Sequence, residues 1–325
     1  MTLFRERRSL VHFFKIQTYS HRLRISLMNL LFFSFESVTG LPEYVGYAFV
    51  FILGAIIGSF LNVVIHRVPL EESIVFPNSA CPKCGNNIKF YDNIPVLSWL
   101  ILGGKCRNCK NPISFRYPAV ELLTAAVFAL TAWQIGLNPF LPVCLIFVAS
   151  IISLIFIDSE HMILPNVITY PLLIFTVSVR VLFPIFIGAE YFSDINIYPM
   201  TLMSSSPAWF VSLVGAILGG LLGGGSLWLI GELWKRLRGV DAMGLGDVKM
   251  MFAVGALLGW RLTFLAIFIG AFTGAIGGML LIAKQRGKDL QAQIPFGIFL
   301  GIGTIIALLF GEKIIGWYIQ NFIPQ

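Results

Sequence analysis

Residues 139–157 read PFLPVCLIFVASIISLIFI, and this run contains no Asp, Glu, Lys or Arg before it meets Asp158. A helix that crosses a bilayer needs about 20 predominantly apolar residues, so the run is long enough to span. Strands of a membrane barrel alternate polar with apolar residues, and this run does not. Because backbone polar groups in hydrocarbon must be paired within their own segment, the run predicts a transmembrane helix that ends at an acid.

The rest of the chain has the same character. Of its 325 residues, 57% are hydrophobic and 12% are charged, whereas soluble domains carry roughly 25% charged residues. Seven further apolar runs are candidate spans, although that at 248–260 is short: 44–66, 118–137, 167–187, 209–231, 248–260, 262–283 and 294–318. The sequence therefore predicts an all-α integral membrane protein with about eight transmembrane helices.

The net charge of +7 follows the predicted loops rather than one helix face, so it favours a membrane partner over nucleic acid. The stretch 188–208 carries Glu190 and Asp194 but no Lys or Arg. By the positive-inside rule, three other loops are cytoplasmic. They contain Arg67, Lys83, Lys89, Lys105, Arg107, Lys110 and Arg116; Lys235, Arg236 and Arg238; and Lys284, Arg286 and Lys288.

Residues 1–43 form a basic N-terminal extension that does not fit this alternation. Its six cations should stay inside, but eight spans place them outside: Arg5, Arg7, Arg8, Lys15, Arg22 and Arg24. Residues 25–35 could belong to an additional membrane element, the extension could lie along lipid headgroups, or the true start could be Met28. We favour Met28. A secretory signal peptide fits less well, because no small-residue cleavage site precedes a soluble domain.

Four of the five cysteines form two Cys-x-x-Cys pairs, Cys81 with Cys84 and Cys106 with Cys109, inside a predicted cytoplasmic domain at 67–117. Four thiolates complete the closed tetrahedral shell of structural zinc, so we expect them to bind Zn²⁺. Two disulfides or a redox role are alternatives, and a reducing cytoplasm argues against disulfides. A loop of about 50 residues buries little apolar surface, so a metal would help it to fold. Cys144 lies in an apolar run and is expected to be a buried hydrophobe.

Two acids lie at the ends of predicted spans. Asp158 follows the span at 139–157 and Asp247 precedes the span at 248–260, so both should lie at the cytoplasmic boundary. Two neighbouring carboxylates do not both ionise easily, so one keeps a proton while the other acts as a base toward water. This is the chemistry of an aspartic hydrolase. Asp247 could instead be a helix N-cap, and Glu160 and Asp241 are competing acids.

Several motifs in order resemble those of the type IV prepilin peptidases, membrane aspartic peptidases of the Gly-x-Gly-Asp type. The resemblance covers Leu41 to the last span. Besides the double Cys-x-x-Cys, it rests on GSFLNVVIHRVP at 58–69, NIPVLSW at 93–99, RYPAVE at 116–121, DSEHMILPN at 158–166 and GLGDVK at 244–249.

The resemblance implies that Asp158 and Asp247 are the catalytic pair of a peptidase domain at 118–325, in the bacterial cytoplasmic (inner) membrane. It implies prepilin or pseudopilin substrates with a short basic leader ending in Gly. It also implies S-adenosylmethionine-dependent N-methylation of the new N-terminus. The chain has no Rossmann-type glycine motif, so the methyl-donor site should be built from the cytoplasmic loop and the span ends. Glu121 is a candidate residue for binding the donor there.

Two other classes of protein remain open on the chemistry alone. A proton-coupled transporter could use two membrane aspartates, but its acids would lie nearer mid-span and beside broken helices. A non-enzymatic assembly protein could dock through the zinc loop and would not need an acid pair. The order of the motifs favours the peptidase over both.

Overall fold

The structure is a computed structural model that describes residues 39–194, 205–240, 243–284 and 295–322, together with Glu36 and Met203. Most of the N-terminal extension, including Met28, lies outside these residues, and so does Asp241. The predictions made for them stay predictions.

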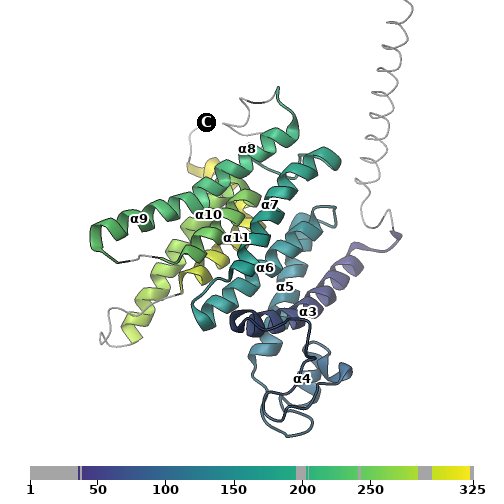
Figure 1. The fold of residues 1–325 in the computed structure, drawn as a ribbon. Helices are drawn as coiled ribbons and strands as arrows, with labels where there is room; N and C mark the ends of the chain where they lie inside the picture. The colour runs from purple at the N-terminus through teal and green to yellow at the C-terminus, as the bar shows by residue number, and fades with distance from the viewer. Residues whose placement is uncertain are drawn as a thin grey trace, which may run out of the picture.

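The described part of the chain is a helical bundle (Figure 1), without any strand beyond two isolated bridges. Seven of its elements are long: α3 (Glu43–Arg67), α5 (Arg116–Ile135), α6 (Leu141–His161), α7 (Asn166–Phe186), the run α8 (Ala208–Gly220), η4 (Leu221–Gly225) and α9 (Ser226–Arg238), α10 (Leu245–Lys284) and α11 (Phe296–Phe322). Three short elements lie between α3 and α5: η1 (Val68–Leu70), η2 (Phe90–Asn93) and α4 (Leu97–Ile101). The prediction of an all-α membrane protein is confirmed.

Among the described residues, seven helical elements are long and apolar enough to cross a membrane, one fewer than the sequence predicts. The difference lies in α10, whose 40 residues join the two spans predicted at 248–260 and 262–283. Gly259 divides it with a non-helical backbone, φ 74° and ψ 174°. A continuous 40-residue helix would be about 60 Å long, twice the hydrocarbon thickness. The break at Gly259 divides α10 into a short segment at 245–258 and a longer one at 260–284, and only the longer one has the usual length of a span.

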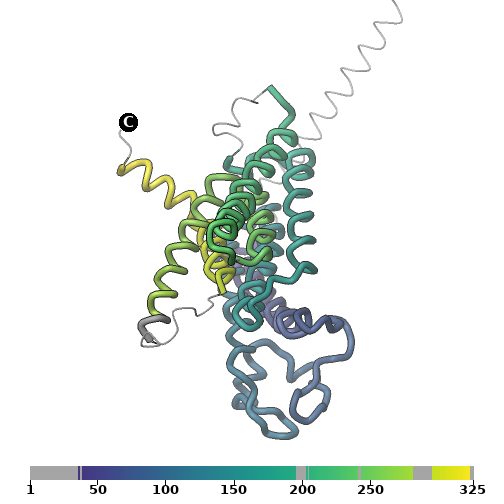
Figure 2. Tube along the Cα trace, turned by 60° about the vertical axis from the view of Figure 1, so that its left-hand side comes forward, coloured from purple at the N-terminus to yellow at the C-terminus, as the bar shows by residue number. Residues whose placement is uncertain are grey.

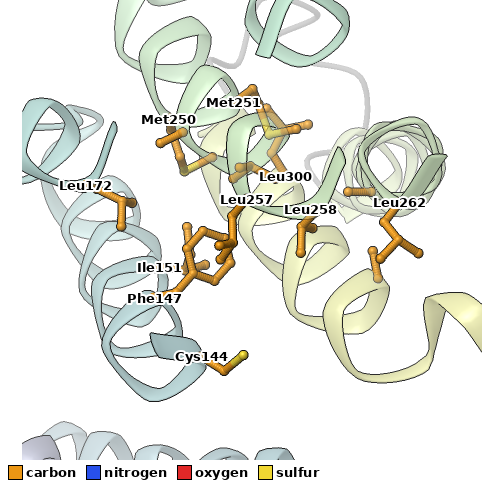
Figure 3. Packing of buried hydrophobic residues seen from close by; sticks show 14 of the residues in the cluster. Cys144, Phe147, Ile151, Leu172, Met250, Met251, Leu257, Leu258, Leu262 and Leu300 are labelled. Carbon is orange, nitrogen blue, oxygen red and sulfur yellow. The ribbon is translucent and has the colours of Figure 1, made fainter. Parts of the chain in front are cut away.

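Helix α6 lies between two hydrophobic clusters. One face packs against α3 and α5 through Leu145, Val148 and Ile152. The other packs against α7, α10 and α11 through Phe147 and Ile151, which lie in one cluster with Leu257 and Leu300 (Figure 3). Cys144, fully buried in this second cluster, is a small core residue as expected. Helix α6 therefore joins the two halves of the bundle.

The two ends of the bundle are chemically different. The four-cysteine loop projects beyond one end (Figures 1 and 2). Glu160, near the end of α6, forms an ion pair with Arg116 at the start of α5, directly after that loop. At the start of α6, Phe140 packs on Phe183 and Phe192. Asp158 therefore lies at the loop end and Phe192 at the opposite end.

A buried ion pair between Arg180 and Asp194 stabilises the end of the bundle opposite the cysteine loop. The Arg180 Nη1 donates to Asp194 Oδ1 at 2.8 Å, and its Nε donates to the Ala256 carbonyl at 3.0 Å. Both side chains are almost fully buried, at 0% and 2% exposed. Asp194 also lies against Gly259, where a Cβ would meet its carboxylate at 2.5 Å. The pair thus joins α7 to the break in α10.

Candidate active site

The carboxyl groups of Asp158 and Asp247 lie together at the loop end of the bundle. A Cβ placed on Gly297 would lie 2.8 Å from Asp158 Oδ2 and 2.9 Å from Asp247 Oδ1. The backbone N–H of Ile298 donates to Asp158 Oδ2 at 3.1 Å. Both side chains are buried, at 5% and 8% exposed. Three helices, α6, α10 and α11, therefore build one paired-carboxylate site.

Local sequence positions each aspartate. Asp158 is in the last turn of α6, which ends at His161 and is followed by Met162 in the left-handed conformation, at φ 54°. Pro165 then precedes α7. Asp247 is the third residue of α10, so it does not cap that helix. Its carboxylate instead faces Gly297 and Asp158 across the bundle.

Gly246 has a packing role that the sequence does not show. A Cβ on Gly246 would lie 2.7 Å from the Leu164 Cβ, so this glycine allows α10 to begin directly against the segment after α6. The Lys249 Nζ donates to Asn166 Oδ1 at 2.8 Å and joins α10 to α7 beside the same site.

Glu160 is separate from the carboxylate pair. Its carboxylate accepts from Arg116 Nη1 on α5. The two side chains are 23% and 29% exposed, so this pair lies at the edge of the bundle. The position of Glu160 therefore favours a structural link over a second catalytic acid.

The four loop cysteines form one sulfur cluster, and their Sγ atoms all lie within 4.8 Å of one another. The Sγ atoms of Cys81 and Cys109 are 3.8 Å apart. Tetrahedral zinc with Zn–S bonds of about 2.3 Å requires sulfurs roughly 3.8 Å apart, so the donor set and its spacing fit Zn²⁺. All four cysteines are free, which is inconsistent with two disulfides in this conformation.

The two cysteine pairs sit in equivalent backbone turns. Cys81 N–H donates to Asn86 O at 2.9 Å, and Cys106 N–H donates to Asn111 O at 2.9 Å. Each turn then closes with an isolated bridge, Ala80 with Asn87 and Lys105 with Pro112. The sequence Cys-x-x-Cys-x-Asn-x-Ile occurs at both 81–88 and 106–113, and this repeat is the sequence signal for the two equivalent turns.

The cysteine thiols do not ionise alike. A hydrogen bond from the backbone of Asn111 is the main cause that lowers the pKa of Cys109 to about 6. For Cys84, a backbone hydrogen bond from Asn86 lowers the pKa, but desolvation and the neighbouring sulfurs outweigh it and raise the pKa to about 11. A bound cation would compensate the negative charge and allow all four thiols to ionise.

Two known families of protein domains match parts of this chain. Residues 52–135 match the bacterial peptidase A24 N-terminal domain, and residues 145–279 match the type IV leader peptidase family. A protein of Pseudomonas aeruginosa is 35% identical over 292 residues, which cover 83% of this chain and 92% of the relative. The chain belongs to the type IV leader peptidase family.

Other relatives in the family agree. A protein of Aeromonas hydrophila is 35% identical over 89% of this chain and 98% of its own length. One of Neisseria gonorrhoeae is 36% identical over 72% and 82%. All three relatives are named prepilin leader peptidase/N-methyltransferase. No solved structure matches the chain.

Glu121, which the sequence suggests as an anchor for the methyl donor, is the sixth residue of α5. Its side chain is buried in α5, and its Oε2 accepts the backbone N–H of Val96 at 2.7 Å. Val96 belongs to the NIPVLSW motif, so two motifs without a part in the carboxylate pair meet here.

Proposed function

We propose that this chain is a membrane aspartic endopeptidase that removes the leader of type IV prepilins or pseudopilins, and then methylates the new N-terminus. The observation that carries the proposal is the burial of Asp158 and Asp247 together against Gly297. Membership of the leader peptidase family and the names of the relatives support the substrate class and the second activity.

In the proposed cleavage step, the two carboxyl groups share one proton. The ionised group accepts a proton from a water molecule, which attacks the carbonyl carbon of the glycine before the scissile bond. The protonated partner donates to the carbonyl oxygen. When the C–N bond breaks, the carboxyl group that took the proton from water gives it to the departing amine, and a hydroxyl of the intermediate returns a proton to the other carboxylate. The products are a carboxylic acid and a free amine, and the pair again shares one proton. The Ile298 N–H holds Asp158 Oδ2 in a fixed orientation.

The position of the carboxylates suits a substrate that is anchored in the membrane. They lie at the ends of membrane-sized helices, on the same side of the bundle as the cysteine loop. We propose, from the Lys and Arg pattern, that this side faces the cytoplasm of a bacterial inner membrane. A basic leader would then remain in the cytoplasm while the apolar helix of the prepilin stays in lipid.

The methylation step needs a methyl donor, and the names of the relatives favour S-adenosylmethionine. Bound beside the new amine, it would supply a methyl group: an N–C bond forms, the C–S bond breaks, and the amine releases a proton. In our proposal the four cysteines hold a structural zinc ion that keeps the loop folded.

The test of cleavage uses purified full-length protein in lipid nanodiscs with a synthetic prepilin. Asp158→Asn and Asp247→Asn should each abolish leader cleavage, measured by mass spectrometry. Glu232→Gln, on the exposed part of α9, is the control and should cleave like the wild type. Substantial turnover by either Asn variant would refute the two-aspartate assignment.

A further inference from the structure

A cavity of about 430 Å³ lies between α3, the start of α5 and the cysteine loop. Small-molecule sites typically enclose about 300–1,000 Å³, so it is large enough for a cofactor. It lies outside the carboxylate pair. The motifs at 58–69, 93–99 and 116–121 have no part in that pair, and each contributes residues to this cavity: Ser59 and Asn62, Val96 and Trp99, Tyr117 and Glu121.

Asn62, one of the residues that line this cavity, has a hydrogen-bond acceptor without a partner. Its Nδ2 donates to the carbonyls of Gly58 at 3.3 Å and Tyr117 at 3.1 Å. Because both partners are acceptors, the nitrogen must face them, and the amide cannot be reversed. Oδ1 is buried without a hydrogen-bond partner, and the residue is 4% exposed. A buried unpaired acceptor is costly, so a ligand with a donor group would complete it.

Glu121 supplies a carboxylate in the same cavity, and strained backbone holds it. Val96 has φ 61° and ψ −50°, which for a β-branched residue is the rare γ-turn conformation. This turn directs the Val96 N–H onto Glu121 Oε2. Strain of about 1–3 kcal/mol is typical of backbone at ligand clamps. On the other side, Gly58 packs against Glu121, where a Cβ would lie 2.7 Å from its Cα.

The lining has the chemistry to bind an S-adenosyl compound. The carboxylate of Glu121 suits ribose hydroxyls or a cationic group, and Asn62 Oδ1 suits an N–H or O–H donor. Trp99 offers an aromatic surface for a base or a sulfonium, with its Nε1 already bonded to Ile113 O at 3.2 Å. We propose that this cavity is the methyl-donor site, with Glu121 and Asn62 as its main polar contacts. The inference rests on the proposed methyltransferase function.

The cavity also lies next to the peptidase site. Tyr117 lines it, and the preceding Arg116 pairs with Glu160 on the last turn of α6. Asp158 is in that same turn. The Arg116 and Glu160 pair thus holds the start of α5, with its part of the cavity, beside the end of α6. The cavity and the carboxylate pair therefore lie at the same end of the bundle, where the new amine would form.

The test measures binding directly. Full-length protein in nanodiscs is dialysed against labelled S-adenosylmethionine, and the unreactive product S-adenosylhomocysteine is used as competitor. Glu121→Gln and Asn62→Leu should each raise Kd at least about tenfold, the equivalent of 1.4 kcal/mol. Glu312→Gln, on α11 beside Arg261, is the matched control and should bind like the wild type. Zinc content and elution volume report whether each variant is folded.

A second measurement does not depend on any variant. Ultraviolet cross-linking of labelled donor to the wild type should label peptides from 59–121. Label confined to other peptides, or unchanged Kd in both folded variants, would overturn the cavity assignment and leave the methyltransferase function standing. A wild type that cleaves prepilin but binds no donor would overturn the methyltransferase part of the proposed function, and this inference with it.

Discussion

Gly297 is the residue against which both carboxylates rest. A side chain there would meet Asp158 Oδ2 at 2.8 Å and Asp247 Oδ1 at 2.9 Å. Contacts this short force a neighbour to move, and both neighbours are buried short side chains with little freedom. The sequence gives no signal for this role, because Gly297 is one of 31 glycines and lies outside the motifs we identified.

We expect Gly297→Ala to lower kcat/KM for leader cleavage by about 100-fold, because displaced catalytic groups lose their alignment. The same substitution at Gly316, also in α11, is the control, because a Cβ there meets nothing within 4 Å. Cleavage rates of the two variants on one prepilin make the comparison. Equal rates would show that the carboxylates tolerate a methyl group between them.

At the scale of elements, the two cysteine turns differ at one position. Gly85 has φ 70° and the equivalent Lys110 has φ 57°, so both turns need the left-handed conformation after the second cysteine. A residue other than glycine costs about 1–2 kcal/mol there. The first turn avoids this strain because it has Gly85 at the position, and the second turn retains the strain because it has Lys110.

We therefore expect Gly85→Ala to weaken zinc binding by about 5- to 30-fold, the equivalent of 1–2 kcal/mol. A Cβ at Gly85 meets nothing within 4 Å, so backbone strain is the only cost. Lys110→Gly removes the same strain and should bind zinc at least as tightly as the wild type. Competition with a chromophoric chelator measures both affinities, and a loss in Lys110→Gly as large as that in Gly85→Ala would contradict this explanation.

The connection between α7 and the break in α10 depends on a buried charge pair. Removing one member leaves the other charge buried and unpaired, which typically lowers the free energy of unfolding by about 3–5 kcal/mol. Replacing both members with apolar residues of similar size restores much of the lost stability. The exposed pair of Arg236 and Glu232 on α9 should contribute little, at most about 1 kcal/mol.

Arg180→Met should thus lower the apparent Tm markedly, and Arg180→Met with Asp194→Leu should recover much of that loss. Arg236→Met is the matched control and should leave Tm almost unchanged. Thermal unfolding of the three variants in one detergent gives their Tm values, which should be highest for Arg236→Met, lower for the double variant and lowest for Arg180→Met. A double variant as unstable as Arg180→Met alone would mean that the charges themselves, rather than their pairing, are required.

The whole molecule consists of two helical clusters that share α6. The carboxylates come from α6 and α10, and the glycine against them comes from α11. The cysteine loop instead joins α3 to α5, on the other side of α6. The cysteine cluster and the carboxylate pair therefore belong to different parts of the bundle, joined at Arg116 and Glu160.

Removal of zinc should consequently affect methylation more than cleavage. Cys81 and Cys106 line the proposed methyl-donor cavity, so unfolding of the loop would destroy it. Chelator-treated protein should cleave prepilin but yield an unmethylated product, and added zinc should restore methylation. Mass spectrometry of the product distinguishes the two steps. A parallel loss of both would mean that the loop also supports the carboxylate pair.

The sequence by itself determined the features that depend on local composition and spacing. Long apolar runs specify membrane helices, and two close pairs of cysteines predict a loop that gathers four thiols, as a zinc site requires. The motif order was enough to indicate the family and to single out Asp158 and Asp247. For these properties, neighbouring residues in the chain carry the information.

Only the tertiary structure decided which distant residues meet. The approach of both aspartates to Gly297, the pairing of Glu160 with Arg116 and the unpaired Asn62 Oδ1 all depend on how helices pack. The break in α10 is a similar case, because Gly259 becomes a break through its backbone conformation and its contact with Asp194. Side-chain packing between helices, which local sequence does not encode, selects these partners.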